Sequence, residues 1–387
     1  MGRIPVTVLT GFLGAGKTTL LNRLIKQPGF GDTAIIINEF GATDVDGTLV
    51  SQVEDRAFAT TTGCLCCTVS GDVRFTLLRL LDEAERGVGP MFSRVVIETT
   101  GLADPAPVLR SFMTTERMRA CFAINAVAAV IDAQQGERHL ARFDEAARQA
   151  ALADLLVLSR TDAADAGAQG RLGARLRGLN PVASICPADR MTPAALFSVA
   201  ARDPAGRAPD AAAWLGVPRP GPQDDPGARH GPADTHAAHH HRHAHDPEHD
   251  HPHDVNRHGD RVSAFCFTAD SPIALADLGR GITTLQSTFG ADLLRIKGLV
   301  ALHEHPAGPG VVHVVGHVQT PVALRDAWPE GVSQTRLVMI VSGAARETAP
   351  DLLQASVPQL RRIGADGAAA RTASQTGTEP MLDPPQT

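Results

Sequence analysis

Three of the chain's six cysteines occupy four consecutive positions in the segment GCLCCT, as Cys64, Cys66 and Cys67. Thiols this close together can form a disulfide, pack in a core, act as a reactive thiol or bind a metal ion. Cytosolic thiols are kept reduced, so clustered cysteines there are more often metal ligands or catalytic groups than disulfides. The expected compartment therefore bears directly on the chemistry of this segment.

Composition and the first residues favour a cytoplasmic protein. The N-terminal MGRIPVTVLTG lacks the apolar region of a secretory signal, and Val6 stands where a myristoylation signal needs Ser or Thr. The longest apolar stretch, near FAINAVAAVI, is too short to span a bilayer. A net charge of −6 and a pI near 6.2 point to neither a nucleic acid nor a membrane as partner. Whether the chain forms a homo-oligomer is left open by the sequence.

A second group of residues that can do chemistry lies in GFLGAGKTT. Gly11, Gly16, Lys17 and Thr18 satisfy the pattern G-x-x-x-x-G-K-[ST], between an apolar run and a helical pattern. Glycines in this context let backbone N–H groups turn toward phosphate, and the helix N-terminus adds a favourable dipole. We expect Lys17 to reach the β and γ phosphates of a nucleotide and Thr18 to coordinate Mg²⁺.

Two later segments agree with a nucleoside triphosphate site. VVIETTG ends an apolar run at Glu98 and reaches Gly101, which would supply an acid for the Mg²⁺ shell and an N–H for the γ-phosphate. SRTD, at 159–162, follows another apolar run. The carboxylate of Asp162 can accept both N–H donors of a guanine edge, or it can cap a helix. After the other two motifs, in this order, the base contact is favoured.

The elements that must position these residues alternate between strands and helices over residues 1–205. Short apolar runs predict buried strands, and two longer segments have apolar residues at helical spacing. The expected strands are 6–10, 34–38, 94–98, 128–132 and 155–159, and the expected helical segments are 72–87 and 137–154. This alternation predicts an α/β fold, a P-loop NTPase domain with a mostly parallel sheet and its ligands at the carboxyl ends of the strands.

The composition changes after this domain. Residues 206–260 hold eleven of the sixteen histidines and no apolar periodicity, which predicts a His-rich flexible linker. Its imidazoles can bind zinc, nickel, cobalt or copper, either as a metal reservoir or incidentally. Residues 261–345 predict a smaller α+β domain of four strands and a helix near 272–288. Residues 346–387 are expected to be disordered.

These motifs stand in the order seen in the CobW-like P-loop GTPases, a zinc-metallochaperone group related to the nickel-handling GTPases of urease and hydrogenase maturation. The chain resembles that family over residues 4–165, in TGFLGAGKTTLLN, INEFG, GCLCCTV, VIETTGLADPAP and the SRTD strand. A looser resemblance to the family's C-terminal domain lies in RIKGLV and LVMIVSG.

The resemblance implies a role for each matching residue, with Lys17, Thr18 and Glu98 at the catalytic centre. The residues implied to bind GTP are Gly11, Gly14, Ala15, Gly16, Lys17, Thr18, Thr19, Glu98, Thr99, Thr100, Gly101, Ser159, Arg160 and Asp162. Ser159 and Arg160 stand where the family usually has Asn and Lys, whereas Asp162 is retained. Asp46 matches a switch-region aspartate that approaches Mg²⁺.

In this family the C-x-C-C cysteines bind Zn²⁺, and thiolates are strong zinc ligands. Cys64, Cys66 and Cys67 supply three of the usual four ligands, so the fourth position is open or taken by Glu39, a water or a target protein. The alternative is a structural zinc or a buried thiol cluster.

The resemblance thus implies a GTP-hydrolysing zinc metallochaperone that uses GTP, Mg²⁺ and Zn²⁺ and delivers zinc to a client metalloprotein. Two other functions stay open. One is a delivery factor for Co²⁺ or Ni²⁺, and the other is a metal buffer or sensor in which nucleotide only stabilises the fold.

Overall fold

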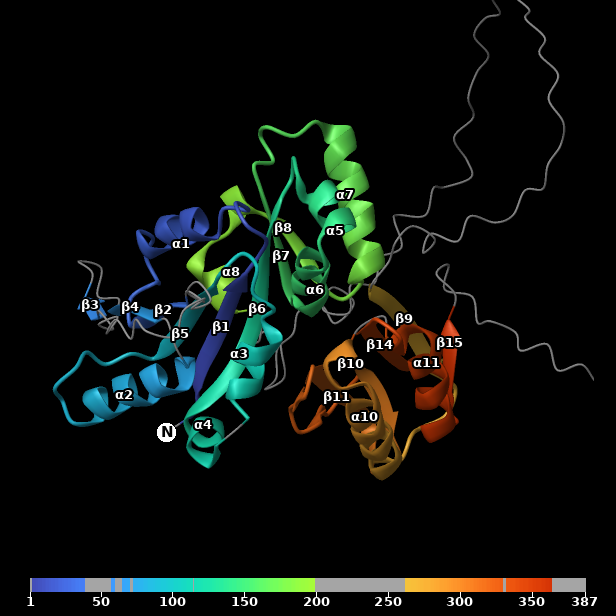
Figure 1. Cartoon of the computed structure of the whole chain (residues 1–387). Helices are drawn as coiled ribbons and strands as arrows, with labels where there is room; N and C mark the ends of the chain where they lie inside the picture. Colours follow the sequence, from blue (N-terminus) through green and yellow to red (C-terminus); the bar gives the residue numbers. More distant parts are fainter. Residues whose placement is uncertain are drawn as a thin grey trace, which may run out of the picture.

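The computed structural model describes residues 2–38, 57–59, 65–69, 72–113, 115–198, 262–329 and 332–363, with the backbone alone for 57–59 and 65–69. These residues form two domains, each built on one sheet (Figure 1). The expected linker at 206–260 lies outside the described residues. Within the described ranges, no helix is both long and apolar enough to cross a bilayer.

The first domain has an eight-stranded sheet in the order β3-β4-β2-β5-β1-β6-β7-β8. All neighbours are parallel except β3, which runs antiparallel to β4. The strands are β1 (Ile4–Thr10), β2 (Thr33–Asn38), β3 (Ala57–Ala59), β4 (Leu65–Val69), β5 (Arg94–Thr99), β6 (Phe122–Asp132), β7 (Leu155–Ser159) and β8 (Ser184–Pro187). The expected P-loop-type α/β domain with a mostly parallel sheet is confirmed.

Helices cover both faces of this sheet, which is why its central strands are continuous apolar runs. On one face Leu20 and Leu24 of α1 pack with Leu9 of β1 and Val96 of β5. On the other, α2 places Leu77 against β2 and β5. The helices are α1 (Lys17–Ile25), α2 (Val73–Glu85), α3 (Ala106–Ser111), α4 (Glu116–Cys121), α5 (Gly136–Arg142), α6 (Asp144–Leu152), α7 (Ala166–Leu179), the 3₁₀ turn η1 (Ala188–Arg190) and α8 (Pro193–Phe197).

The helical segment expected at 137–154 is divided into α5 and α6. Phe143 between them has extended backbone angles, with φ −122° and ψ 123°. Its ring stacks on Phe12 of the first βα loop, with ring centroids 4.6 Å apart. The turn between the two helices thus gives the loop after β1 an aromatic neighbour.

The second domain is an antiparallel sheet in the order β12-β11-β10-β14-β9-β15, with β13 paired to β11. Its helices α10 and α11 pack on one face of the sheet (Figure 1). The elements are β9 (Val262–Ala269), α10 (Leu275–Phe289), η2 (Gly290–Asp292), β10 (Leu293–Leu302), β11 (His305–Val315), β12 (Val318–Gln319), β13 (Ala323–Leu324), β14 (Thr335–Ser342), α11 (Ala345–Ser356) and β15 (Leu360–Ile363).

The expected boundary at 345, followed by a disordered tail at 346–387, was placed too early. Residues up to Ile363 belong to the second domain, as α11 and β15. The buried side of α11 is made largely of small residues and contains Pro350 within the helix, so its hydrophobic pattern is weak. Residues 364–387 lie outside the described ranges.

The other face of the second sheet packs against the first domain. Ala151 and Leu152 of α6 belong to one hydrophobic cluster with Leu294 of β10 and with Val338 and Ile340 of β14. The two domains therefore share a hydrophobic core, and both α6 and α7 of the first domain lie beside the second sheet (Figure 1).

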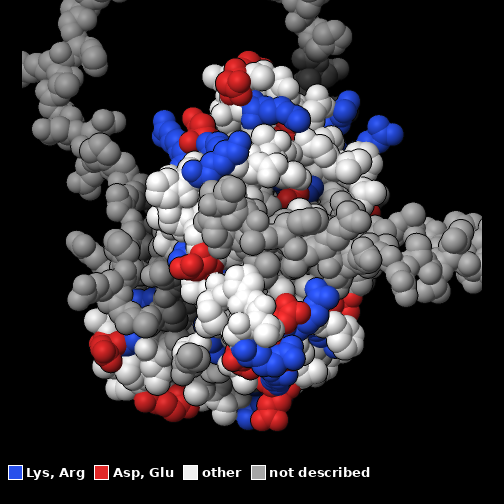
Figure 2. Space-filling model, turned by 90° about the vertical axis from the view of Figure 1, so that its left-hand side faces the viewer, with Lys and Arg blue, Asp and Glu red and all other residues white. Residues whose placement is uncertain are grey.

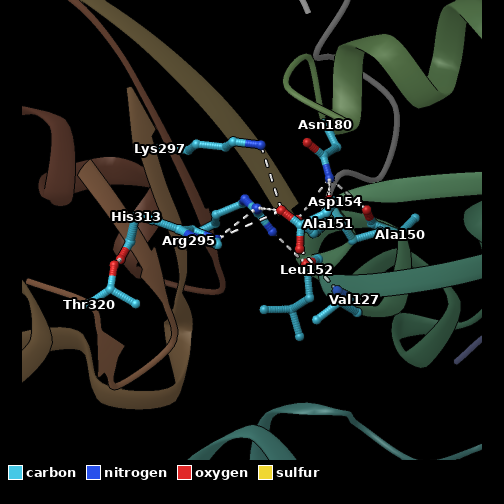
Figure 3. A network of polar contacts seen from close by, with 11 residues as sticks. Val127, Ala150, Ala151, Leu152, Asp154, Asn180, Arg295, Lys297, His313 and Thr320 are labelled. Atoms are coloured by element: carbon cyan, nitrogen blue, oxygen red, sulfur yellow. Dashed lines mark hydrogen bonds and ion pairs between the residues drawn. The ribbon is translucent and has the colours of Figure 1, made fainter. Parts of the chain in front are cut away.

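A buried ionic network crosses the same interface (Figure 3). Asp154, directly after α6, accepts a hydrogen bond from Arg295 of β10 and another from the Val127 backbone N–H at 3.0 Å. Lys297 Nζ lies 3.6 Å and His313 Nε2 3.8 Å from the same carboxylate. Asp154 and Arg295 are 4% and 0% exposed, so the charges are paired away from water.

At the edge of the first domain that carries α2, the charged side chains lie on the surface, in contrast to the buried network at Asp154 (Figure 2). Where charged residues gather on the described surface of this view, basic and acidic side chains lie side by side. Ion pairs of α2, such as Arg79 with Glu83 and Arg117 with Asp82, follow this pattern. These exposed pairs add little to stability, in contrast to the buried network around Asp154.

Candidate nucleotide and metal site

The loop between β1 and α1 has the backbone of a phosphate cradle. Gly11, Gly14 and Gly16 have φ values of 140°, 73° and 94°, which are strained for residues with side chains. A Cβ at Gly11 would lie 2.3 Å from the carbonyl oxygen of Val130 on β6. Gly16 caps α1 without a side chain, which leaves the first N–H groups of this helix to an anion. These features fit a nucleotide phosphate.

Lys17 is turned into this loop. Its Nζ donates to the carbonyl oxygens of Gly11 at 2.8 Å and Phe12 at 3.4 Å, and the residue is 8% exposed. Burial lowers the pKa of Lys17, while the negative charge of Glu98 acts in the opposite direction. The ammonium thus occupies the space beneath the loop and is held there by carbonyl oxygens.

Thr18 and Glu98 meet across the two central strands. β1 and β5 are parallel neighbours, with Leu9 opposite Glu98. The Thr18 hydroxyl donates to Glu98 Oε1 at 2.5 Å, and Glu98 is 4% exposed. A hydroxyl and a carboxylate at the carboxyl edge of a parallel sheet are oxygen ligands of the kind that Mg²⁺ prefers, so this pair fits the magnesium site expected from the sequence.

The segment after β5 touches the phosphate loop directly. Thr99 donates from its hydroxyl to the Thr10 hydroxyl at 2.9 Å. A Cβ at Gly101 would lie 2.5 Å from Leu13 Cα, so the two loops are in backbone contact there. Of the other residues expected to bind GTP, Ala15 is buried, Thr100 is half-buried and Thr19 is exposed on α1.

The side chains of Ser159 and Arg160 both donate hydrogen bonds to carbonyl oxygens of the phosphate loop. Ser159 Oγ donates to the Ala15 carbonyl at 2.7 Å. Arg160 has a left-handed backbone, with φ 53°, and its Nη2 donates to the Gly14 carbonyl at 2.9 Å. Its Nη1 pairs with the buried carboxylate of Asp132 at the end of β6. The Arg160 side chain therefore supports the phosphate loop in this structure.

Asp162 is exposed on the loop between β7 and α7. It does not cap that helix, because the N-cap is Asp165, whose carboxylate accepts from the Ala168 N–H at 2.8 Å. The cap considered as the alternative role of Asp162 is thus filled by another residue. The base contact stays a prediction.

Two cysteines of the expected metal motif lie on β4, which is the neighbour of the edge strand β3 in the same sheet. Cys66 and Cys67 belong to β4, where they pair with Ile35 and Ile36 of β2. Ile36 pairs on its other side with Ile97 of β5, one residue before Glu98. The side chains of Cys66 and Cys67 are not described, and Cys64, Glu39 and Asp46 lie outside the described residues.

Glu304, His305 and His313 of the second domain make contacts within the fold, whereas His303 and His317 are exposed. The Glu304 carboxylate accepts from the Leu275 N–H at the start of α10, at 3.1 Å. His305 Nε2 lies 2.7 Å from the Arg325 carbonyl, and His313 belongs to the network at Asp154. Within the described part of the chain, no three His, Cys, Asp or Glu residues are grouped as a metal site.

Two residues that hold the loop after Gly101 have no signal in the sequence. Gln149 of α6 is fully buried and donates from Nε2 to the carbonyls of Gly101 at 3.2 Å and Ala103 at 3.0 Å. Arg148 donates to the Asp104 carboxylate at 3.1 Å. Both residues lie in an ordinary amphipathic helix far along the chain, so only the fold associates them with this loop.

Comparison with known proteins agrees with this geometry. Residues 5–187 match the family described as CobW/HypB/UreG, nucleotide-binding domain, and residues 262–357 match the cobalamin synthesis protein cobW C-terminal domain. The zinc chaperone YjiA of Escherichia coli is 38% identical over 185 residues, which are 48% of this chain and 57% of that protein. The zinc chaperone CobW of Pseudomonas aeruginosa is 35% identical over 214 residues, covering 47% of this chain and 56% of the relative.

The chain thus spans about half the length of the curated relatives it matches. A solved structure, the Zn(II)-bound YjiA GTPase from E. coli, is similar over 92% of this chain and 99% of that one, with 25% identity and a TM-score of 0.62. The likeness therefore extends over both domains. With its nucleotide-binding and C-terminal domains in this order, the chain belongs to the CobW-like family of P-loop GTPases.

Proposed function

We propose that this chain hydrolyses GTP and, under the control of the bound nucleotide, carries zinc to a client metalloprotein. The observation that carries the proposal is the strand order β4-β2-β5, in which Cys67 and Ile97 pair with the same residue, Ile36. At about 4.8 Å between strands, the C-x-C-C strand runs about 10 Å from the strand that carries Glu98. A conformational change beside the γ-phosphate would therefore reach the cysteines through one intervening strand, β2.

The phosphate loop supplies the chemistry for hydrolysis to GDP and phosphate. Lys17 leaves the carbonyls of Gly11 and Phe12 and turns to the β and γ phosphates, where its positive charge offsets charge on the transferring group. Mg²⁺ would be held by Thr18 directly and by Glu98 through its water shell, and would supply further positive charge to the phosphates. In this proposal the backbone N–H of Gly101 senses the γ-phosphate.

Zinc is the cargo in this proposal. Cys64, Cys66 and Cys67 provide three thiolates, and the fourth position is filled by Glu39, water or the client. A site with three protein thiolates releases its metal more readily than a closed structural site with four. The zinc-chaperone names of the relatives support this metal over Co²⁺ or Ni²⁺.

The metal half of the proposal is tested by chelator competition on the full chain. Zinc, cobalt and nickel affinities are measured with GDP and with a non-hydrolysable GTP analogue, with a Cys64→Ser/Cys66→Ser/Cys67→Ser variant as control. We expect the zinc affinity to differ between the two nucleotides and to fall in the variant. Equal zinc affinity in both nucleotide states would sink the coupling.

The enzymatic half is tested by Lys17→Ala. Because Lys17 is the only cation of the phosphate-loop motif, this variant is expected to lose GTP hydrolysis while the fold is kept. Phosphate release and thermal unfolding are measured together. Turnover at the wild-type rate would defeat the assignment as a GTPase.

A further inference from the structure

Arg148 of α6 joins the second domain to the loop after β5, residues 100–104, which we call the nucleotide-sensing loop after its proposed role. Its Nε donates to Asp104 Oδ2 at 3.1 Å, three residues after Gly101. Its Nη1 donates to Ser342 Oγ at 3.0 Å and its Nη2 to the Ala291 carbonyl at 2.8 Å. The planar guanidinium has fixed donor directions, so one rigid group spans both domains at 20% exposure.

The acceptors on the second domain are themselves held in place. Ser342, at the end of β14, donates to Asp292 Oδ1 at 2.8 Å, and Arg148 Nη1 lies 3.7 Å from the same oxygen. A Cβ at Gly343 would lie 2.8 Å from Asp292 Oδ2, so this turn is tightly packed. The turn after β14 and the Asp292 carboxylate thus lie together beside the Arg148 guanidinium.

Gln149 gives α6 a second hold on the nucleotide-sensing loop. Its Nε2 hydrogen bonds reach the Gly101 and Ala103 carbonyls, and the side chain is 0% exposed. The adjacent residues Arg148 and Gln149 thus fix the segment from Gly101 to Asp104 at three points. This is the segment that approaches the phosphate loop at Leu13.

The far end of α6 is also tied to the second domain. Arg295 Nη1 donates to the Leu152 carbonyl at 2.7 Å and pairs with Asp154 (Figure 3). Asn180 Nδ2 lies 2.8–3.0 Å from the carbonyls of Ala150, Ala151 and Ala153, which fixes the last turn of the helix. Because Arg148 in the middle of α6 and Leu152 at its end both contact the second domain, a displacement of the second sheet is expected to reach α6.

We propose that Arg148 and Gln149 are positioning residues through which the second domain sets the place of Gly101, and with it the rate of GTP hydrolysis. This inference rests on the proposed GTPase function. We expect the same link to alter nucleotide affinity, and because coupling between binding sites is reciprocal, the bound nucleotide would in turn alter the contacts of α6 with Ala291 and Ser342. Whatever displaces the second domain, a client protein included, would then change turnover without touching the nucleotide.

The link is tested with four variants of the full chain. Arg148→Ala removes the bridge, Ser342→Ala removes a single acceptor on the second domain, and Arg148→Lys keeps the charge with fewer directed donors. Arg171→Ala is the matched control, because Arg171 pairs with Glu137 within the first domain at 3.5 Å. The readouts are kcat and KM for GTP, and hydrogen exchange of residues 290–294 and 342–346 with GDP and with a GTP analogue.

In the wild type, exchange in these two segments is expected to differ between the nucleotides. Arg148→Ala is expected to abolish that difference and to change kcat by about fivefold or more, with KM altered less. Arg148→Lys should restore part of both effects, and Arg171→Ala should match the wild type. If Arg148→Ala does not fold, Ser342→Ala decides, with a smaller change of the same kind expected.

Two results separate the failure of this link from failure of the function itself. Wild-type chain that hydrolyses GTP, together with an Arg148→Ala variant of unchanged kcat and unchanged exchange difference, would overturn the link alone. A wild-type chain that neither binds nor hydrolyses GTP would overturn both. A purely structural role of Arg148 would lower thermal stability and leave the exchange difference in place.

Discussion

Asp154 of the first domain and Arg295 of the second form an ion pair from which water is excluded. Burial alone would raise the pKa of Asp154, but the charges of Arg295, Lys297 and His313 and the Val127 N–H outweigh it and hold that pKa well below its usual value. Desolvation makes such a pair costly to form and more costly to break on one side only. The pair thus specifies how the two domains fit together.

Removal of one partner of this pair is expected to be strongly destabilising. Asp154→Asn leaves Arg295 buried without a counter-charge, so we expect the free energy of unfolding to fall by about 3–5 kcal/mol. Urea unfolding of the full chain measures the change. Arg171→Ala, which breaks an exposed pair, serves as the control and is expected to have little effect. A loss as small as that of the control would contradict this account.

His313 is expected to make stability depend on pH. Burial lowers its pKa to about 3, with Arg295 and Lys297 acting in the same direction and Asp154 opposing them. The folded chain therefore keeps His313 neutral, whereas the unfolded chain binds a proton below a pKa near 6.5. Stability from the neutral form is present above pH 6.5 and is lost progressively as the pH falls toward 3.

Between pH 7.5 and pH 5.5 this proton uptake is expected to remove about 1.4 kcal/mol from the free energy of unfolding. His313→Gln removes the titrating group, so its stability should fall less over the same interval. Urea unfolding at the two pH values gives both slopes. Identical slopes for the wild type and the variant would mean that His313 is not the group responsible.

Gly101 is expected to tolerate no side chain. A methyl group there would meet Leu13 Cα at 2.5 Å, which forces the loop away from the phosphates. Since displacements of this size disturb catalytic geometry strongly, Gly101→Ala should lower kcat for GTP by about tenfold or more. Phosphate release under saturating GTP measures this.

A matched glycine elsewhere provides the control for that variant. Gly170 lies within α7, and a Cβ there would meet nothing within 4 Å. Gly170→Ala should raise the free energy of unfolding by about 0.5–1 kcal/mol, with GTP turnover unchanged. Equal turnover in the two variants would show that the contact between Gly101 and Leu13 does not matter.

Variants of Asp162 and Asp165 are expected to have different effects, because we assign base selection to Asp162 and helix capping to Asp165. Asp162→Asn loses a charged acceptor for the guanine edge, so GTP affinity should fall by about tenfold or more while ATP affinity stays the same. Asp165→Ala loses the cap of α7 and should cost about 1 kcal/mol of stability without a change in the ratio of GTP to ATP affinity. Competition against a fluorescent GDP measures both. An unchanged ratio in Asp162→Asn would exclude it as the base contact.

The parts of the fold that the sequence predicts are those with a strong local pattern. The runs at 34–38 and 155–159 are buried on both faces and become β2 and β7. β6 starts at Phe122, well before the expected 128, because its first half mixes Asn125 with apolar residues. The second domain extends to Ile363 beyond the expected boundary, since the alanine-rich face of α11 carries little hydrophobic signal.

The candidate site likewise contains residues that short motifs predict and contacts that only the packing of the fold creates. Lys17, Thr18, Glu98 and Gly101 are placed by short motifs whose order alone predicts their meeting at one edge of the sheet. The contacts made by Arg148 depend on how α6 packs between two domains, and no spacing in the sequence encodes such packing. The motif SRTD predicts Ser159 near the base, whereas its hydrogen bond to the Ala15 carbonyl depends on how the loops after β1 and β7 pack together.

The core shared by the two domains has a consequence for how such proteins diverge. Neither half presents a finished surface on its own, because the second sheet uses its inward face to cover α6. In a hybrid that joins the first domain of this chain to the second domain of a relative, the two sides of the domain interface would come from two different proteins. Such hybrids should fold only when the incoming half brings its own counterparts of Arg295 and Lys297, so the two halves are bound to change together.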